Sequence, residues 1–273
     1  MPYNPTELKS LAQAIRGRVI EMSHAAGAAH LGSCLSCIDI LVCLYWDVLS
    51  IEPDNASAPS RDRFILSKGH AASALYATLA QRGFFPAARL GTLACPGSDL
   101  EEHPGPHCVP GVEAATGSLG HGLSLGVGMA VASRVQRHPF RVYVLLGDGE
   151  CNEGSVWEAA LFAAAQRLEN LTVIVDFNKW QATGRSCEVM ALAPLKDKWT
   201  AFGWSVHETD GHDLQALGGL LAHTPDGSGK PVAILAHTIK GKGVSFMEDD
   251  NNWHYRIPTA EEVMKARKEL GLS

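Results

Sequence analysis

The stretch from Arg141 to Gln181 decides the fold of this chain, and it reads RVYVLLGDGECNEGSVWEAALFAAAQRLENLTVIVDFNKWQ. An apolar run from Val142 to Leu146 ends at a glycine, which is typical of a buried strand. A second such run extends from Leu171 to Phe177. The segment between the two runs predicts a helix. The stretch is therefore expected to form two parallel strands joined by a helical crossover.

The helix of this unit is expected to bury one face and to stop at Asn170. The residues expected on the buried face are Trp157, Leu161, Phe162, Ala165 and Leu168.

Polar residues follow each of the two predicted strands. Asp148 follows the first and Asn178 follows the second, so both are expected at the sheet edge where ligands bind. One carboxylate, one amide oxygen and a nearby backbone carbonyl make a hard oxygen site suited to Mg²⁺ or Ca²⁺, with phosphate oxygens completing the shell. The glycines of Gly147-Asp148-Gly149 allow close approach of a ligand, and the Gly149 N–H with the following helix N-terminus favours an anion. These features predict a metal–diphosphate site.

The stretch resembles the thiamine diphosphate motif, in which GDG is followed one strand–helix–strand unit later by Asn. Its GDGECNEGSVWEAA segment closely resembles the transketolase version. The resemblance implies thiamine diphosphate and Mg²⁺ (or Ca²⁺ or Mn²⁺) as cofactors, with the metal held by Asp148, Asn178 and the Trp180 carbonyl. It also implies a catalytic and cofactor-side role for Glu153 at a subunit interface. The cofactor-binding residues implied within this stretch are Gly147, Asp148, Gly149, Glu153, Asp176 and Asn178.

Motifs on the N-terminal side resemble the same family. AHLGSCLS resembles the family's GHPGGSLS, which implies a substrate-side catalytic His30 and a cofactor-side Ser33, although Ala29 and Leu31 depart from the pattern. SKGHAASALYA implies that His70 contacts the diphosphate. Glu102-His103-Pro104 resembles the family's GHP and implies a second substrate-side histidine, His103.

Two further motifs complete the resemblance. PGVEAATGSLGHG resembles the family's PGVE–TGSLGQG, which implies that Gly117 and Leu119 line the cofactor's rings. KGKGV followed by Asn252-Trp253-His254 implies that Lys240 and His254 hold the diphosphate, with His254 also catalytic. The motifs occur in the family's order between residues 26 and 254.

The remaining elements predict an α/β fold. The resemblance implies a three-layer thiamine diphosphate-binding fold with a mainly parallel central sheet flanked by helices, formed as a single domain over residues 1–273. The helices are expected at residues 6–23 (with Thr6 as the cap), 37–48, 67–82, 194–202, 214–221 and 261–270. Further strands are expected at residues 63–66, 204–207 and 232–236. Residues 25–33 are expected to form a loop.

Composition narrows the functional classes. The 273 residues are 46% hydrophobic and 19% charged, with a net charge of −6 and no long basic run, so nucleic acid is not expected as a partner. No apolar run approaches the roughly 20 residues of a membrane span, and the N-terminus lacks a signal peptide's apolar region, which favours the cytoplasm. Cys34 and Cys37 form a CxxC without a second pair at zinc-ligand spacing, so packing is favoured over a metal or redox role.

The resemblance implies an incomplete active site. In full transketolases a second domain carries the glutamate that activates the aminopyrimidine and most of the arginines that bind the sugar phosphate. This chain is therefore expected to be the N-terminal subunit of a split transketolase, forming an α₂β₂ assembly with a separate C-terminal subunit. The expected reaction transfers a two-carbon ketol unit from a ketose phosphate to an aldose. The alternatives are a deoxyxylulose-phosphate synthase-like protein, a 2-oxoacid dehydrogenase α subunit, or a nonenzymatic regulatory homologue.

Overall fold

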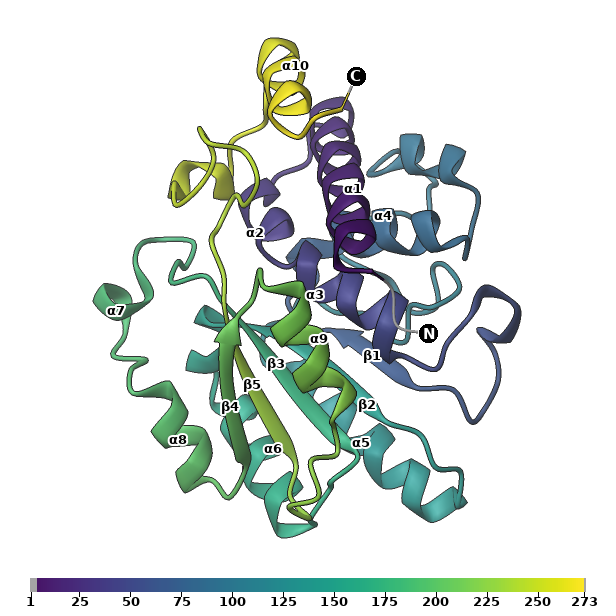
Figure 1. The fold of residues 1–273 in the computed structure, drawn as a ribbon, viewed down its shortest axis with the longest axis vertical. Helices are drawn as coiled ribbons and strands as arrows, with labels where there is room; N and C mark the ends of the chain where they lie inside the picture. The colour runs from purple at the N-terminus through teal and green to yellow at the C-terminus, as the bar shows by residue number, and fades with distance from the viewer. Residues whose placement is uncertain (1–3, 273) are drawn as a thin grey trace.

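The computed structural model describes residues 4–272 and is built around a parallel five-stranded sheet (Figure 1). Its strands are β1 (Arg63–Leu66), β2 (Val142–Gly147), β3 (Leu171–Phe177), β4 (Ser205–Asp210) and β5 (Val232–His237). They lie in the order β1-β2-β3-β5-β4. The predicted crossover is confirmed, because β2 pairs directly with β3 and Gly147 lies opposite Asp176.

Helices cover both faces of the sheet, which confirms the predicted three-layer α/β fold. On one side lie α1 (Pro5–Ala26), α3 (Ile38–Cys43), α4 (Ala72–Arg82) and α9 (Leu214–Ala222). On the other side lie α5 (His121–Gln136), α6 (Gly154–Ala165) and α8 (Leu195–Ala201). Shorter or peripheral helices are α2 (Leu31–Ser36), α7 (Ser186–Val189), α10 (Ala260–Glu269), the π-helical turn Leu44–Val48, and the 3₁₀ turns Pro53–Asn55, Gly69–Ala71, Ala87–Thr92, Gly149–Asn152 and Asn251–His254.

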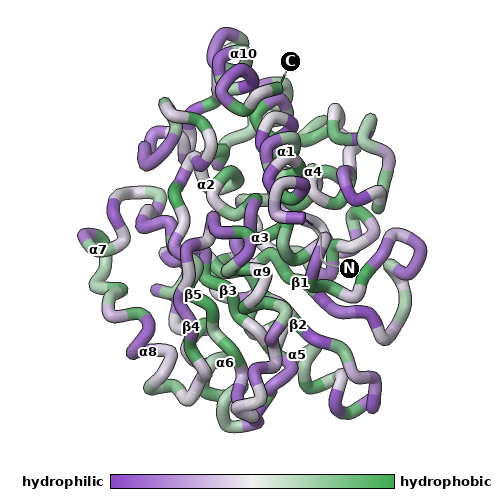
Figure 2. The backbone as a smooth tube through the Cα atoms, viewed as in Figure 1, coloured by the Kyte–Doolittle hydropathy of each residue, from purple (hydrophilic) through white to green (hydrophobic). Residues whose placement is uncertain are grey.

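Each face of the sheet has its own hydrophobic core. Leu145 of β2 and Ile174 of β3 pack into the first core, whereas their neighbours Val144 and Val173 pack into the second. Because successive side chains of a strand point to opposite faces and both faces are covered, these two strands are predominantly apolar. Figure 2 shows this as green along the inner part of the sheet, with purple at the β4 edge and in peripheral loops. Among the described residues, no helix is long and apolar enough to cross a membrane.

Two predictions at the N-terminal side were wrong. The cap of α1 is Asn4 rather than Thr6, because the Asn4 side chain accepts a hydrogen bond from the Thr6 N–H at 2.9 Å and Glu7 completes a capping box. The segment after His30, expected as part of a loop, begins the short helix α2, whose six residues are all buried.

The predicted buried face of the crossover helix was wrong at Leu161, Phe162 and Ala165, whereas Leu168 is fully buried and Trp157 packs against the second core. Leu161 and Phe162 are 56% and 49% exposed, and Ala165 is exposed as well. The residues that α6 buries are Val156, Ala159, Ala160 and Ala163. Small alanine side chains allow close packing, and α6 turns this narrow face inward and leaves Leu161 and Phe162 outside.

Candidate active site

A cavity of about 380 Å³ lies at the carboxyl ends of β2 and β3. Most of the predicted site residues line it: His30, Ser33, His70, His103, Gly117, Leu119, Gly147, Asp148, Gly149, Glu153, Asn178, Trp180 and His254. Two predicted residues, Asp176 and Lys240, do not line it but are fully buried nearby, where they contact its lining. A larger cavity of about 660 Å³ beside Arg141 and Asn170 lies at the amino ends of the same strands, the edge where parallel sheets do not bind ligands.

Asp148 is a buried carboxylate whose hydrogen bonds come from neutral groups. It is 1% exposed, and it accepts from the Gly149 N–H at 2.9 Å and the Ser186 hydroxyl at 2.7 Å. Burial raises the pKa of Asp148 to about 6. A hard cation beside it would restore the charged form, so the carboxylate fits a magnesium site.

The orientation of the Asn178 amide follows from its neighbour Asp176. The amide nitrogen donates to Asp176 Oδ2 at 3.4 Å, and an ionised carboxylate can only accept. The Asn178 oxygen therefore points elsewhere, and it accepts from the Trp180 N–H at 3.0 Å. Asp148, Asn178 and Trp180 together offer the carboxylate, amide and carbonyl oxygens that Mg²⁺ prefers. Within residues 4–272 no cluster of three or more His, Cys, Asp or Glu could hold a metal, so a cation here would take further oxygen ligands from water or from a bound molecule.

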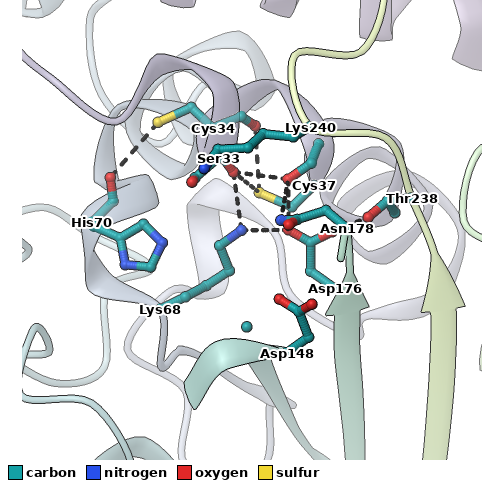
Figure 3. Close-up of polar contacts among 12 residues, drawn as sticks. Ser33, Cys34, Cys37, Lys68, His70, Asp148, Asp176, Asn178, Thr238 and Lys240 are labelled. Atoms are coloured by element: carbon teal, nitrogen blue, oxygen red, sulfur yellow. Dashed lines mark hydrogen bonds and ion pairs between the residues drawn. The ribbon is translucent and has the colours of Figure 1, made fainter. Parts of the chain in front are cut away.

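A buried ion pair between Lys68 and Asp176 lies beneath the site (Figure 3). Their side chains are 1% and 0% exposed, and the Lys68 amine also donates to the Ser33 carbonyl at 2.9 Å. Asp176 accepts further hydrogen bonds from the hydroxyls of Ser36, at 2.6 Å, and Thr238. Burial alone would raise the pKa of Asp176, but Lys68 and these donors hold it below its usual value. Asp176 is therefore an ionised group that orients Asn178.

Four histidines form a cluster at the mouth of this site. The His30 ring lies 5.5 Å from His70, 5.8 Å from His103 and 5.0 Å from His254, measured between centroids. His30 has a left-handed backbone, with φ of 68°, and its N–H donates to the His254 carbonyl at 2.7 Å. Burial lowers the pKa of His30 to about 4, that of His254 to about 3, and that of His70 well below its usual value. These three imidazoles are neutral at pH 7 and can donate or accept hydrogen bonds.

Lys240 sets the orientation of one of these rings. Its amine lies 3.0 Å from His254 Nδ1 and 2.6 Å from Asn251 Oδ1. Burial, followed by the charge of Lys68, lowers the pKa of Lys240 to about 8, so it remains mainly cationic at pH 7. A cationic amine can only donate, so His254 Nδ1 accepts and its Nε2 carries the proton.

Two glycines allow side chains to pack closely at the cavity wall. Gly117 has φ of 144°, and a Cβ there would come within 2.9 Å of the His103 ring. A Cβ on Gly149 would come within 2.9 Å of the Gln181 side chain. The amide nitrogen of Gln181 is buried without a hydrogen-bond partner among the described residues, so this wall also carries an unused donor.

The sequence reasoning missed several groups at the site. Glu150 is buried and accepts from the Gly120 N–H at 2.8 Å, the Gly147 N–H at 3.1 Å and the Ser67 hydroxyl, which joins the GDG turn to the start of α5. Lys68 lies within the SKGHA motif, but the motif alone did not predict its ion pair with Asp176. The other missed lining residues are Asn152, Gln181, Ala182 and Thr183. Lys68 lies two residues after the end of β1 and Glu150 three residues after the end of β2, and a charged residue so soon after an apolar strand was the available signal.

Comparison with known proteins yields consistent matches. The family model for the transketolase thiamine diphosphate binding domain matches residues 8–273. The chain is 44% identical to an apulose-4-phosphate transketolase subunit from Phocaeicola vulgatus, over 93% of this chain and 90% of that protein. It is 42% identical to the 6-deoxy-6-sulfo-D-fructose transketolase subunit SqwG of Clostridium sp., over 97% and 96%. The solved transketolase from Leishmania mexicana superposes with a TM-score of 0.92 at 26% identity, covering all of this chain and 42% of that one.

Proposed function

Because this chain belongs to the transketolase family and matches its thiamine diphosphate binding domain over residues 8–273, we propose that it is the N-terminal subunit of a split transketolase. It is an enzyme subunit of the thiamine diphosphate-binding type. The proposed reaction transfers a two-carbon ketol unit from a ketose phosphate to an aldose acceptor. The observation that carries the proposal is a single cavity that combines Asp148, Asn178 and Trp180 with the four histidines.

In this proposal the cavity holds thiamine diphosphate with Mg²⁺, or with Ca²⁺ or Mn²⁺ in its place. Asp148, Asn178 and the Trp180 carbonyl would bind the metal, and His70 would reach the diphosphate. Lys240 and His254 also serve the diphosphate, and Gly117 and Leu119 line the rings. When bound, thiamine diphosphate supplies the nucleophilic carbon and the electron sink that cleavage of a ketose C2–C3 bond requires.

The chain's own residues bind the donor and move protons. His30, which is neutral at pH 7, and His103 face the donor's hydroxyl groups, where an imidazole can accept a proton and return it. His254 presents its Nε2–H, because Lys240 donates to its Nδ1. Glu153 is exposed at the edge of the cavity, in a position to meet a second subunit.

The proposed partner is a separate C-terminal subunit in an α₂β₂ assembly, supplying the acid that activates the aminopyrimidine. An exposed apolar surface supports a partner of this kind. Leu125 of α5 and Leu161 and Phe162 of α6, called here the α5–α6 patch, are 42%, 56% and 49% exposed. Two of the relatives named above are themselves subunits of transketolases. We further propose that residues 1–273 form a single domain and that the protein acts in the cytoplasm.

The test mixes this chain with the C-terminal subunit of a transketolase in the presence of a ketose phosphate and an aldose. The mixture should form ketol-transfer products and an α₂β₂ mass by light scattering, whereas this chain alone should form none. A Phe162→Asp variant should bind thiamine diphosphate normally but assemble poorly. Turnover of pyruvate or a branched 2-oxoacid instead, or full ketol transfer by this chain alone, would contradict the proposal.

A further inference from the structure

The loop from Asn178 to Ser186, called here the site loop, touches the predicted metal ligands at both ends. It begins at Asn178 itself. It ends at Ser186, whose hydroxyl donates to Asp148 Oδ2 at 2.7 Å. Between these ends, Trp180 and the next three residues line the cavity. The conformation of this loop therefore decides where the metal-binding oxygens lie.

One carboxylate outside the site loop binds two side chains of the loop. Asp249 accepts from both terminal nitrogens of Arg185, at 2.7 and 2.6 Å, and from the indole N–H of Trp180 at 2.8 Å. The Arg185 guanidinium also lies 3.8 Å from the centre of the Trp180 ring. A carboxylate that receives a two-pronged arginine and an indole uses both of its oxygens, which gives the contact a defined geometry.

Asp249 also belongs to the segment that carries the other half of the site. Its backbone N–H donates to the Lys240 carbonyl at 2.8 Å. Two residues further on, the Asn251 side chain donates to the Ala182 carbonyl of the site loop at 3.1 Å and accepts from the Lys240 amine. The Asp249 contacts thus connect the site loop to the segment that contains Lys240 and His254.

These contacts lie near the surface and do not belong to the hydrophobic core. The side chains of Arg185 and Asp249 are 30% and 55% exposed, so water and salt screen their attraction. Asp249 and Lys179 both have left-handed backbones, with φ of 59° and 69°. Such a contact adds little to the stability of the whole domain, but it can determine the conformation of a polar loop.

We propose that Asp249 is a positioning residue for the cofactor site. By holding Arg185 and Trp180, it keeps the site loop in the conformation that presents Asn178 and the Trp180 carbonyl to the metal before the cofactor arrives. This inference rests on the proposed thiamine diphosphate site. If the loop is released, part of the binding free energy is spent on ordering it again, and the apparent affinity falls.

Two variants of the full chain test the proposal. Asp249→Asn removes the charge and keeps a residue type that tolerates the left-handed backbone. Arg185→Gln removes the other partner. The control is Arg89→Gln, which breaks a comparable exposed pair with Asp99 and a guanidinium–ring contact with Phe85, on 3₁₀ turn Ala87–Thr92.

Two measurements are made on each protein. The first is the calorimetric Kd for thiamine diphosphate at fixed MgCl₂. The second is hydrogen exchange without cofactor at the Gln181 and Ser186 amides, which donate within the loop to the Gly184 and Lys179 carbonyls. We expect each variant to raise Kd about tenfold and to lose loop protection, with the amides of β2 and β3 unchanged. The Kd of the double variant should be no higher than that of either single variant, and the control should match the wild type in both Kd and loop exchange.

The possible outcomes distinguish failure of the proposed Asp249 role from failure of the proposed cofactor site. The role of Asp249 would be overturned if the wild type binds the cofactor and both variants keep the wild-type Kd and the wild-type hydrogen exchange of the loop amides. Loss of protection throughout the sheet would show a general structural role and would also overturn it. Failure of the wild-type chain to bind thiamine diphosphate with Mg²⁺ would overturn the proposed cofactor site, and this inference with it.

Discussion

Replacing Lys68 with methionine should destabilise the protein strongly. The substitution keeps an unbranched apolar side chain but removes the amine, and it leaves Asp176 charged in a site where its side chain is 0% exposed. The remaining donors to Asp176, the Ser36 and Thr238 hydroxyls and the Asn178 amide, are neutral. Removing one partner of a buried ion pair typically costs about 3–5 kcal/mol. For a chain of this size that corresponds to a fall in Tm of roughly 6–20 °C.

The loss of folding stability in Lys68→Met should increase as the pH rises. In the wild type, Lys68 holds the pKa of Asp176 below its unfolded value, so this contribution to stability is complete above about pH 4 and is lost as the pH falls through the folded pKa. In Lys68→Met, burial without the amine raises the folded pKa above the unfolded one. The variant then loses stability as the pH rises. The difference from wild type should therefore already be present near pH 4.5 and should increase as the pH rises to 7.

Urea unfolding at these two pH values, with EDTA and without cofactor, provides the measurement. The double variant Lys68→Met/Asp176→Asn removes the orphaned charge and should recover at least half of the loss at pH 7. A loss below about 1 kcal/mol at pH 7, or a double variant no more stable than the single one, would refute the reasoning.

The other predictions concern the cofactor site and are measured on the full chain or its assembly. Asp148→Ala should cost about 3 kcal/mol or more of Mg²⁺-dependent binding free energy for thiamine diphosphate, which calorimetry would record as a rise in Kd of roughly a hundredfold or more. Near-wild-type affinity would contradict the assignment of Asp148 as a metal ligand. His70→Ala and His254→Ala should weaken cofactor binding. His30→Ala and His103→Ala should instead lower kcat or raise the donor KM while cofactor affinity is kept. Equal weakening of cofactor binding by all four variants would count against these roles. Because burial raises the pKa of Asp148 to about 6 and a metal needs the carboxylate, cofactor affinity should fall as the pH drops below about 6, by up to about tenfold per pH unit. Asp148→Asn should lack this step, and an identical pH profile in both proteins would exclude Asp148 as its source.

The strands and their ligand-binding edge could be predicted from the sequence because their signals are local. The apolar runs that became β2 and β3 lie within a few residues of Asp148 and Asn178, and a helical crossover allows only one relative direction for the strands. The face of α6 could not be predicted in the same way. Periodicity identifies an apolar stripe but does not say whether the chain itself or a partner covers it, and here Leu161 and Phe162 remain exposed.

The features of the site also divide into those that the sequence predicted and those that it did not. The residues quoted from motifs were recognisable one by one, and their short patterns place His30, Asp148 and Asn178 at the cavity without reference to the rest of the chain. The contacts that orient these groups were not recognisable. Lys68 is 108 residues from Asp176, and Arg185 is 64 residues from Asp249.

The sequence by itself determined the sheet edge, the turn at Gly149 and the chemical types gathered there, since backbone preferences and side-chain periodicity act over short segments. Only the tertiary structure decided which charges are neutralised, which imidazoles stay neutral and how the Asn178 amide faces. A pKa or a hydrogen-bond direction depends on burial and on neighbours brought together from distant parts of the chain, and no short pattern encodes them.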